Sequence, residues 1–228
     1  MGRNSYCIPL VSGSRTNDFS GRTASVGLRS AGKRDNFAHM AAISQQSLLM
    51  SVDEFLDAEP QFTVRHEYLG GTVYAMAGAS TPHNEIAANL IIAVGTRLRG
   101  KPCKPFGSDM KVKLNRAGTP YFYYPDAMIV CNRAGLGASW CEQPTVIFEI
   151  LSESTRSIDE REKHAAYLSI PGLAAYVLIE QDTQRVIIEH RVPTGWNREL
   201  VEGPDAVVRL AAVEVEFPLS ELYERVGA

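Results

Sequence analysis

Apolar and polar positions alternate most clearly in the central part of the chain, between residues 124 and 167. Residues 145–151 read TVIFEIL, and both alternating sets are mostly apolar, so we expect a strand with both faces covered. Glu149 would then point into one of these apolar layers. Asp126 follows a proline and opens a second apolar run that extends to residue 130, which predicts another strand that begins with a carboxylate.

The same kind of pattern predicts helices and further strands along the rest of the chain. Helices are predicted over 51–58, 81–100, 158–169 and 219–226. Strands are predicted over 62–75, with a turn at Gly70-Gly71, and over 174–180, 185–192, 207–210 and 213–217. Helix starts are marked by Ser51 with Glu54, by Thr81 with Pro82, and by Ser157 with Glu160. Because no repeat and no linker follow residue 50, we expect one α/β domain over residues 50–228.

The N-terminal part of the chain differs from the rest in charge and composition. Residues 1–39 hold six basic and two acidic side chains, a charge of +4, while the whole chain carries −3, so residues 40–228 carry −7. The segment is rich in serine and glycine and has no hydrophobic period, which is typical of disorder. We expect residues 1–49 to be an unstructured extension, or upstream sequence left untranslated when synthesis starts at Met40 or Met50. An organelle transit peptide and a nucleic-acid-binding arm are the alternatives.

The cysteines and the hydropathy bear on the cellular setting. Cys7, Cys103, Cys131 and Cys141 form no CxxC pair, so neither a zinc site nor a redox motif is indicated. We therefore expect reduced thiols in the cytoplasm. No run of about 18 apolar residues occurs, and so we expect no membrane span.

Three charged residues of the central part are candidates for chemistry. Asp126 and Glu149 would each point inward from an apolar strand, and paired carboxylates suit a hard cation such as Mg²⁺. Lys163 shares a helical face with Tyr167, four residues further on. The alternatives are structural roles: a turn residue for Asp126, and an arginine partner at a strand end for Glu149. Lys163 would in that case pair within its helix with Asp159.

In this order the three residues resemble a known nuclease signature. Pro125-Asp126, Glu149 in FEILSEST and Lys163 in DEREKHAAY resemble the PD-(D/E)XK nuclease superfamily and, more narrowly, the Uma-type restriction endonuclease family. The stretches RHEYLGGTVYAMAGAS, STPHNEIAANL, GSDMKV and LAAYVLIEQD also resemble this family, and the resemblance covers residues 50–226. The superfamily's lysine usually follows the glutamate by two positions, where this chain has Leu151. In the Uma-type branch the lysine stands on the following helix, which Lys163 matches.

The resemblance implies a fold, a set of site residues and a partner. The fold is a restriction-endonuclease-like single domain of the α/β class, with a central mixed β-sheet flanked by helices. Asp126 and Glu149 would lie on adjacent strands and bind Mg²⁺ or Mn²⁺, with Lys163 packed across them. Glu67 would be an additional acidic member of the site, and its structural alternative is an ion pair with one of two basic residues, Arg65 or Lys113. DNA is the implied partner, and the family suggests a homodimer.

Contacts with a phosphate backbone are predicted in two places. His83 falls in the first turn of the helix over 81–100, near the positive end of the helix dipole, although such a histidine is often only solvated. Residues 97–116 hold seven basic side chains and one acidic side chain, and Lys111 and Lys113 share a strand face there, a candidate DNA-binding surface. The alternative is an ordinary edge strand with solvated lysines. The aromatic run at 121–124 is predicted to pack rather than to stack on bases.

A magnesium-dependent endodeoxyribonuclease is the function that these residues predict. Asp126 and Glu149 would hold the ion at the scissile phosphate, and Lys163 would stabilise developing charge or orient the attacking water. Two other classes are kept as alternatives: a non-catalytic binding protein on a nuclease fold, and a metal-dependent phosphoesterase that acts on RNA or nucleotides. No zinc finger or helix-turn-helix accompanies the site, so sequence-specific base reading is not predicted.

Overall fold

The computed structural model of the chain describes residues 49–152 and 162–227. They belong to one compact unit that spans residues 46–228. The predictions for residues 1–48 lie outside the described part of the chain, and so do the predicted cap formed by Ser157 with Glu160 and the pairing of Lys163 with Asp159.

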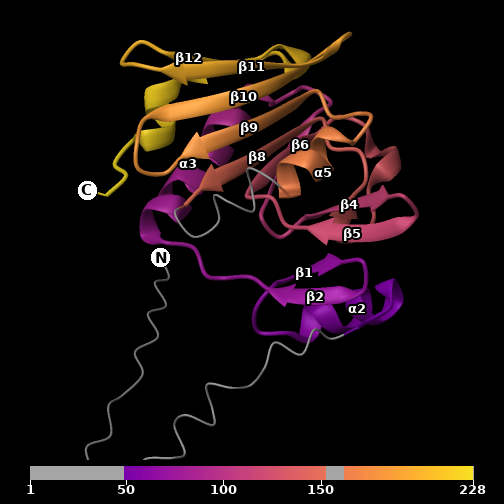
Figure 1. Ribbon diagram of the computed structural model, residues 1–228. Helices are drawn as coiled ribbons and strands as arrows, with labels where there is room; N and C mark the ends of the chain where they lie inside the picture. The colour runs from indigo at the N-terminus through magenta and orange to yellow at the C-terminus, as the bar shows by residue number, and fades with distance from the viewer. Residues whose placement is uncertain (1–48, 153–161, 228) are drawn as a thin grey trace, which may run out of the picture. The chain divides into compact units, whose positions relative to one another are not determined.

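A six-stranded mixed sheet forms the centre of this unit (Figure 1). Its strands, in spatial order, are β11 (Gly195–Glu202), β10 (Arg185–Val192), β9 (Ala175–Glu180), β8 (Val146–Leu151), β6 (Ala127–Val130) and β3 (Lys104–Gly107). Strands β8 and β9 run parallel, and the other neighbours run antiparallel. The predicted central mixed sheet is therefore present, but the sequence pattern missed β3 and β11.

A second sheet of five strands lies beside the first. In spatial order it contains β2 (Thr72–Ala75), β1 (His66–Leu69), β5 (Thr119–Tyr123), β4 (Lys111–Arg116) and β7 (Trp140–Cys141). The predicted hairpin is the β1–β2 pair, and its turn falls at Gly70 and Gly71 as expected. Both glycines have positive φ angles, 59° and 104°, which other residues adopt only with strain.

The helices lie where the sequence predicted them, but some of their boundaries differ from the prediction. The described helices are α2 (Val52–Ala58), α3 (Thr81–Arg97) and α5 (His164–Leu168), with 3₁₀ turns η1 (Glu59–Gln61), η2 (Arg133–Gly135), η4 (Ala211–Val213) and η5 (Leu219–Tyr223). Helix α2 carries the predicted capping box of Ser51 and Glu54. The predicted cap of α3 was wrong by one residue: Ser80 is extended and its hydroxyl accepts a hydrogen bond from the His83 N–H, so Thr81 is already helical. The predicted closing helix is only the 3₁₀ turn η5.

Both faces of the central sheet are covered. On one face α3 packs together with the small sheet of β12 (Val207–Leu210) and β13 (Val215–Pro218) and with η5. On the other face α5 and the five-stranded sheet pack against it. All six residues of β8 are buried, as the two apolar sets of its sequence predict. Glu149 thus lies on a strand that has no wet face.

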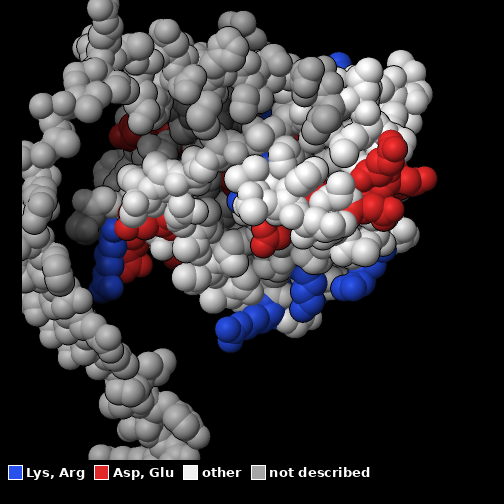
Figure 2. All heavy atoms as spheres, turned by 90° about the horizontal axis from the view of Figure 1, so that it is seen from below, with Lys and Arg blue, Asp and Glu red and all other residues white. Residues whose placement is uncertain are grey.

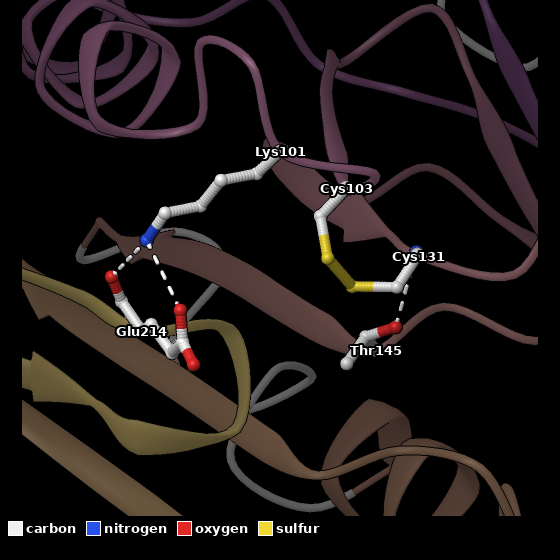
Figure 3. Close-up of a disulfide and its surroundings, with 5 residues drawn as sticks. All are labelled: Lys101, Cys103, Cys131, Thr145 and Glu214. Carbon is white, nitrogen blue, oxygen red and sulfur yellow. Dashed lines mark hydrogen bonds and ion pairs between the residues drawn. A yellow bond between two sulfur atoms is a disulfide. The ribbon is translucent and has the colours of Figure 1, made fainter.

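The expectation of reduced thiols was wrong for two cysteines. Cys103 and Cys131 extend the β3–β6 pairing by one step and form a disulfide, with 3.9 Å between their Cα atoms (Figure 3). Cys141 is a buried free thiol. The spacing rule failed because 28 residues separate the two partners, which become neighbours only through sheet pairing. None of the described helices is both long enough and apolar enough to cross a membrane.

Candidate functional site

Asp126 and Glu149 lie side by side where strand β6 begins and strand β8 approaches its end. Ala127 pairs with Phe148 in the antiparallel ladder, so one further step places Asp126 opposite Glu149 on the same face of the sheet. The Asp126 Oδ2 atom accepts a hydrogen bond of 2.7 Å from the N–H of Ile150, which fixes the carboxylate against the end of β8. The sequence predicted an inward-pointing carboxylate on each strand from the alternation of apolar residues, and the family resemblance implied that the two strands are adjacent.

Lys163 brings a buried positive charge to the two acidic strands. Its Nζ atom lies 3.0 Å from Glu67 Oε1 and 3.5 Å from Glu149 Oε1. Tyr167, one helical turn later, donates a hydrogen bond of 3.1 Å from its hydroxyl to Glu149 Oε1. Lys163 and Tyr167 therefore reach the same carboxylate, as their four-residue spacing predicts.

Glu67 faces Lys163 from the other sheet. Its Oε1 atom also accepts a hydrogen bond of 3.3 Å from the N–H of Tyr124. The structural alternatives for Glu67 are wrong, because Arg65 pairs with Asp109 and Lys113 pairs with Glu142. Carboxylates from both sheets, Glu67 and Glu149, thus converge on the ammonium group of Lys163.

His83 stands beside Asp126, at the start of α3. Its Nε2 atom lies 3.2 Å from Asp126 Oδ2, and its side chain is largely buried. The reading of His83 as a simply solvated residue is therefore wrong. The structure places this ring at the Asp126 carboxylate itself.

A cavity of about 560 Å³ opens over these residues. It is lined by Arg65, Met76, Ala77, Gly78, Ala79, Ser80, His83, Ser108, Tyr124, Asp126, Glu149, Ile150, Ser152, Lys163 and Gln181. Its lining thus includes Asp126, Glu149 and Lys163 together, with His83 at one side. Glu67 supports Lys163 without itself lining the cavity.

A buried polar network behind the cavity was not foreseen from the sequence. The Lys111 ammonium donates a hydrogen bond of 3.2 Å to the Tyr124 hydroxyl, which donates one of 2.9 Å to Glu59 Oε1. Glu59 also accepts from the N–H of His66 at 2.8 Å. Burial lowers the pKa of the Lys111 ammonium, an effect that the charge of Glu59 opposes. No local pattern signals these contacts, because Glu59 and Tyr124 are 65 residues apart.

The predicted phosphate-binding surface at 97–116 is not a continuous basic face. Lys111 is only 4% exposed, so it is not available to a phosphate backbone, and this part of the prediction was wrong. Lys113 pairs with Glu142 at 2.8 Å and lies over the Trp140 ring. Figure 2 shows small separate groups of basic and acidic side chains among the described residues on the face in view.

The aromatic run at 121–124 packs as predicted. Phe122, Tyr123 and Tyr124 are buried, and the rings of Tyr123 and Tyr167 pack edge to face with 5.7 Å between their centroids. The Tyr123 hydroxyl donates a hydrogen bond of 3.0 Å to Glu162 Oε1. These rings therefore support α5 and do not offer a face to bases.

The carboxylates of Asp126 and Glu149 fit a magnesium ion that retains several water ligands. Within residues 49–152 and 162–227, no group of three or more His, Cys, Asp or Glu side chains is arranged to hold a metal ion. Mg²⁺, however, commonly takes only one or two protein carboxylates and completes its shell with water and phosphate oxygens. Asp126 Oδ1 accepts no hydrogen bond from the described residues, so one oxygen of this carboxylate is available to a cation. Glu67, which holds Lys163, is less suited to that task.

These observations agree with the comparisons with known proteins. Residues 52–220 match the family described as "Putative restriction endonuclease", and the chain belongs to this family. The family supports a nuclease-like function. It is also the family that the motifs around Asp126, Glu149 and Lys163 indicated from the sequence.

Relatives and a solved structure extend the match over most of the chain. Two proteins of Synechocystis sp. (strain ATCC 27184 / PCC 6803 / Kazusa) are similar, both called uncharacterized. Protein sll1609 is 28% identical over 73% of this chain and 96% of its own length, and protein slr1290 is 29% identical over 76% and 91%. The crystal structure of a putative nuclease belonging to DUF820 from Anabaena variabilis ATCC 29413 matches with a TM-score of 0.63 at 18% identity, and covers 77% of this chain and 98% of that one. This likeness confirms the predicted restriction-endonuclease-like α/β fold.

Proposed function

We propose that this protein hydrolyses phosphodiester bonds in DNA with the help of Mg²⁺ or Mn²⁺. The observation that carries the proposal is the position of the Lys163 ammonium, within 3.0 Å of Glu67 and 3.5 Å of Glu149, beside a cavity that Asp126 also lines. Two carboxylates hold this buried ammonium group in place. The Lys163 ammonium is therefore positioned to interact with the negative charge of a phosphate.

The cation would be held by Asp126 and Glu149. When bound, it would polarise the scissile phosphate and lower the pKa of water. Water would attack phosphorus and release a proton to solvent, the bond from phosphorus to the leaving sugar oxygen would break, and that oxygen would take up a proton from solvent.

The residues around the cavity would stabilise charge and hold the two carboxylates in place during this reaction. Lys163 stabilises the charge that grows on the phosphate oxygens, and preorganised donors of this kind typically contribute about 10²–10³-fold in rate. Tyr167 fixes Glu149 through its hydroxyl, and the Ile150 N–H fixes Asp126. His83 Nε2, at 3.2 Å, contacts the same oxygen of Asp126, Oδ2, and so also helps to orient that carboxylate.

The direct test is cleavage of a supercoiled plasmid by the purified protein in Mg²⁺ or Mn²⁺, compared with the same protein in EDTA. We expect nicking that EDTA abolishes. Asp126→Asn keeps an oxygen for the Ile150 N–H but removes the charge, so cleavage should fall by at least about 100-fold. The matched control is Asp205→Asn, at an exposed loop aspartate, which should leave the rate unchanged. Equal cleavage by Asp126→Asn and the wild-type protein would remove Asp126 from the proposal.

Two further measurements separate the alternative functions. If calorimetry detects no Mg²⁺ or Mn²⁺ binding and the plasmid stays intact, the protein is a non-catalytic binder on a nuclease fold. If RNA or a small phosphodiester is cleaved while DNA is not, the same residues serve a phosphoesterase with another substrate.

A further inference from the structure

The β1–β2 hairpin presents an exposed aromatic residue next to the acidic site. Glu67 and Tyr74 are directly opposed in the antiparallel ladder, so their side chains project from the same face. Glu67 reaches Lys163, whereas Tyr74 is 49% exposed. Among the described residues, Tyr74 makes no side-chain hydrogen bond or ring contact. This sets it apart from the buried aromatic run at 121–124.

The same face continues from Tyr74 into the cavity. The N–H of Met76 bonds to the carbonyl of Arg65 at 2.8 Å, which extends the hairpin pairing by one step. Arg65 and Met76 therefore stand on the face that carries Glu67 and Tyr74, and both line the cavity. Tyr74 lies two residues from Met76, a spacing of about 7 Å along a strand.

Arg65 adds a positive charge to this face. Its Nη1 atom donates to the carbonyl of Ser108 at 2.6 Å and lies 3.3 Å from Asp109, whose side chain is fully exposed. Its Nε and Nη2 atoms donate no hydrogen bond to the described residues. A guanidinium oriented in this way can still take a phosphate, because two of its nitrogen atoms remain available.

Exposed apolar side chains gather at the same hairpin. Of the six large apolar residues that are exposed in the described part of the chain, Ile92 and Leu200 lie elsewhere. Of the other four, Tyr74 lies on β2, Phe62 and Val64 lie in the segment before β1, and Leu49 forms a bridge to Thr72 of β2. Apolar surface beside a cation and a catalytic cavity suits a ligand that has both flat rings and phosphates.

We propose that this hairpin face, formed by Arg65, Tyr74 and Met76, binds a single strand of DNA at unpaired bases. This inference rests on the proposed function and names the form of its substrate. Tyr74 stacks on a base, and Arg65 takes a backbone phosphate at the cavity rim. Stacking on a side chain needs a base whose face is open, and in a duplex that face is covered by the neighbouring base pairs. The strand that enters the cavity is therefore single-stranded or locally unpaired.

The test measures binding without cleavage. Fluorescence anisotropy with a fluorescein-labelled 12-nucleotide single strand, and with the same strand in a duplex, is recorded in EDTA. Tyr74→Ala should weaken binding of the single strand by about tenfold, within the range for removal of one stacked base, and should leave duplex binding unchanged. Tyr74→Phe, which keeps the ring, should bind like the wild-type protein. Arg65→Gln should reduce the slope of binding against salt by about 0.7, as expected for one lost phosphate contact on a single strand.

Two matched controls lie on the other sheet. Leu200→Ala removes an apolar side chain that is 54% exposed, similar to Tyr74 at 49%. Arg185→Gln removes an arginine whose side chain is 46% exposed and paired with Glu202, whereas that of Arg65 is 43% exposed and paired with Asp109. Both should bind the single strand as the wild-type protein does. Equal losses for Tyr74→Ala and Leu200→Ala, or a Tyr74→Ala loss that is as large on the duplex, would overturn the proposal. A dimer that dissociates on Tyr74→Ala in size-exclusion chromatography would also overturn it, because the face would then belong to a second copy of the chain.

Failure of this inference and failure of the proposed function give different results. In one outcome, the single strand binds in a way that depends on Tyr74 and yet stays uncut when Mg²⁺ is added. That result would support the binding face and contradict the nuclease function. Cleavage of intact duplex that is equally fast with Tyr74→Ala would keep the nuclease and remove the binding face.

Discussion

The two ends of strand β6 are held in opposite ways. At one end Cys131 is joined to β3 by the disulfide, and its N–H bonds to Thr145 at 3.3 Å (Figure 3). At the other end Asp126 is held only by polar contacts, to the Ile150 N–H and to His83. Because the disulfide fixes β6 covalently at one end, the strand can carry a charged side chain at its other end without apolar packing there. The covalent bridge and the candidate site thus lie at opposite ends of the same strand.

The largest effect should come from the cavity end, through Lys163→Met. Removal of one partner of a buried charge pair leaves Glu67 and Glu149 uncompensated, and we expect a loss of about 3–5 kcal/mol in the free energy of unfolding. Urea unfolding followed by circular dichroism measures it. At the disulfide end Lys101→Met removes an ion pair with the exposed Glu214, and this control should cost less than about 1 kcal/mol. Equal losses for the two variants would contradict the contrast between the ends.

The next effect should come from the disulfide. A double variant, Cys103→Ser with Cys131→Ser, releases a bridge between residues 28 apart and should lose about 2–4 kcal/mol of unfolding free energy. The rate of plasmid cleavage at 25 °C should not change, because the bridge lies at the far end of β6. Dithiothreitol should destabilise the wild-type protein and the Cys141→Ala control alike, and should not affect the double variant. If dithiothreitol does not change the unfolding free energy of the wild-type protein, the disulfide does not contribute to its stability.

The smallest effect concerns a tyrosine that closes the cavity end of β9. The Tyr223 hydroxyl donates to the carbonyl of Glu180 at 2.8 Å, next to Gln181 in the cavity wall. Tyr223→Phe should cost about 1 kcal/mol in unfolding free energy, measured by urea unfolding at pH 7. A cost below the error of the measurement would show that this hydroxyl does not hold the strand end.

The same tyrosine gives a pH dependence with a definite sign. Burial raises the pKa of Tyr223 above its ordinary value of 10, and burial together with the charge of Glu162 does the same for Tyr123. A raised pKa means that the folded protein keeps the proton while the unfolded chain loses it. The stabilisation is therefore complete below pH 10 and is lost progressively above it. In Tyr223→Phe the loss between pH 9 and pH 11 should be smaller than in the wild-type protein, and an equal loss would rule out Tyr223 as a contributor.

The cavity end could be predicted from the sequence where its residues obey local periods. The alternation of apolar residues around Asp126 and Glu149 predicted that each carboxylate points inward, and the four-residue step from Lys163 to Tyr167 predicted that both lie on one helical face. The structure has both arrangements. The roles of these residues in metal binding and catalysis stay predictions.

Contacts across the sheets could not be predicted in the same way. Lys111 alternates like a surface lysine of a strand, yet it is buried because Tyr124 and Glu59 come from elements far along the chain. Cys103 and Cys131 carry no spacing signal, because their proximity depends on the pairing of β3 with β6. Strand β11 was missed because its exposed and half-buried residues leave little apolar alternation to read.

The position of Leu151 has a consequence for how the site is assembled. Leu151 is packed in the core at the place where the superfamily carries its lysine, and the ammonium is supplied instead by Lys163, the N-cap residue of α5. The charge and the carboxylates it balances are thus mounted on separate elements. Under the proposed function, the site would be complete only while α5 is packed on the sheet, whereas a lysine at position 151 would be fixed to the same strand as Glu149.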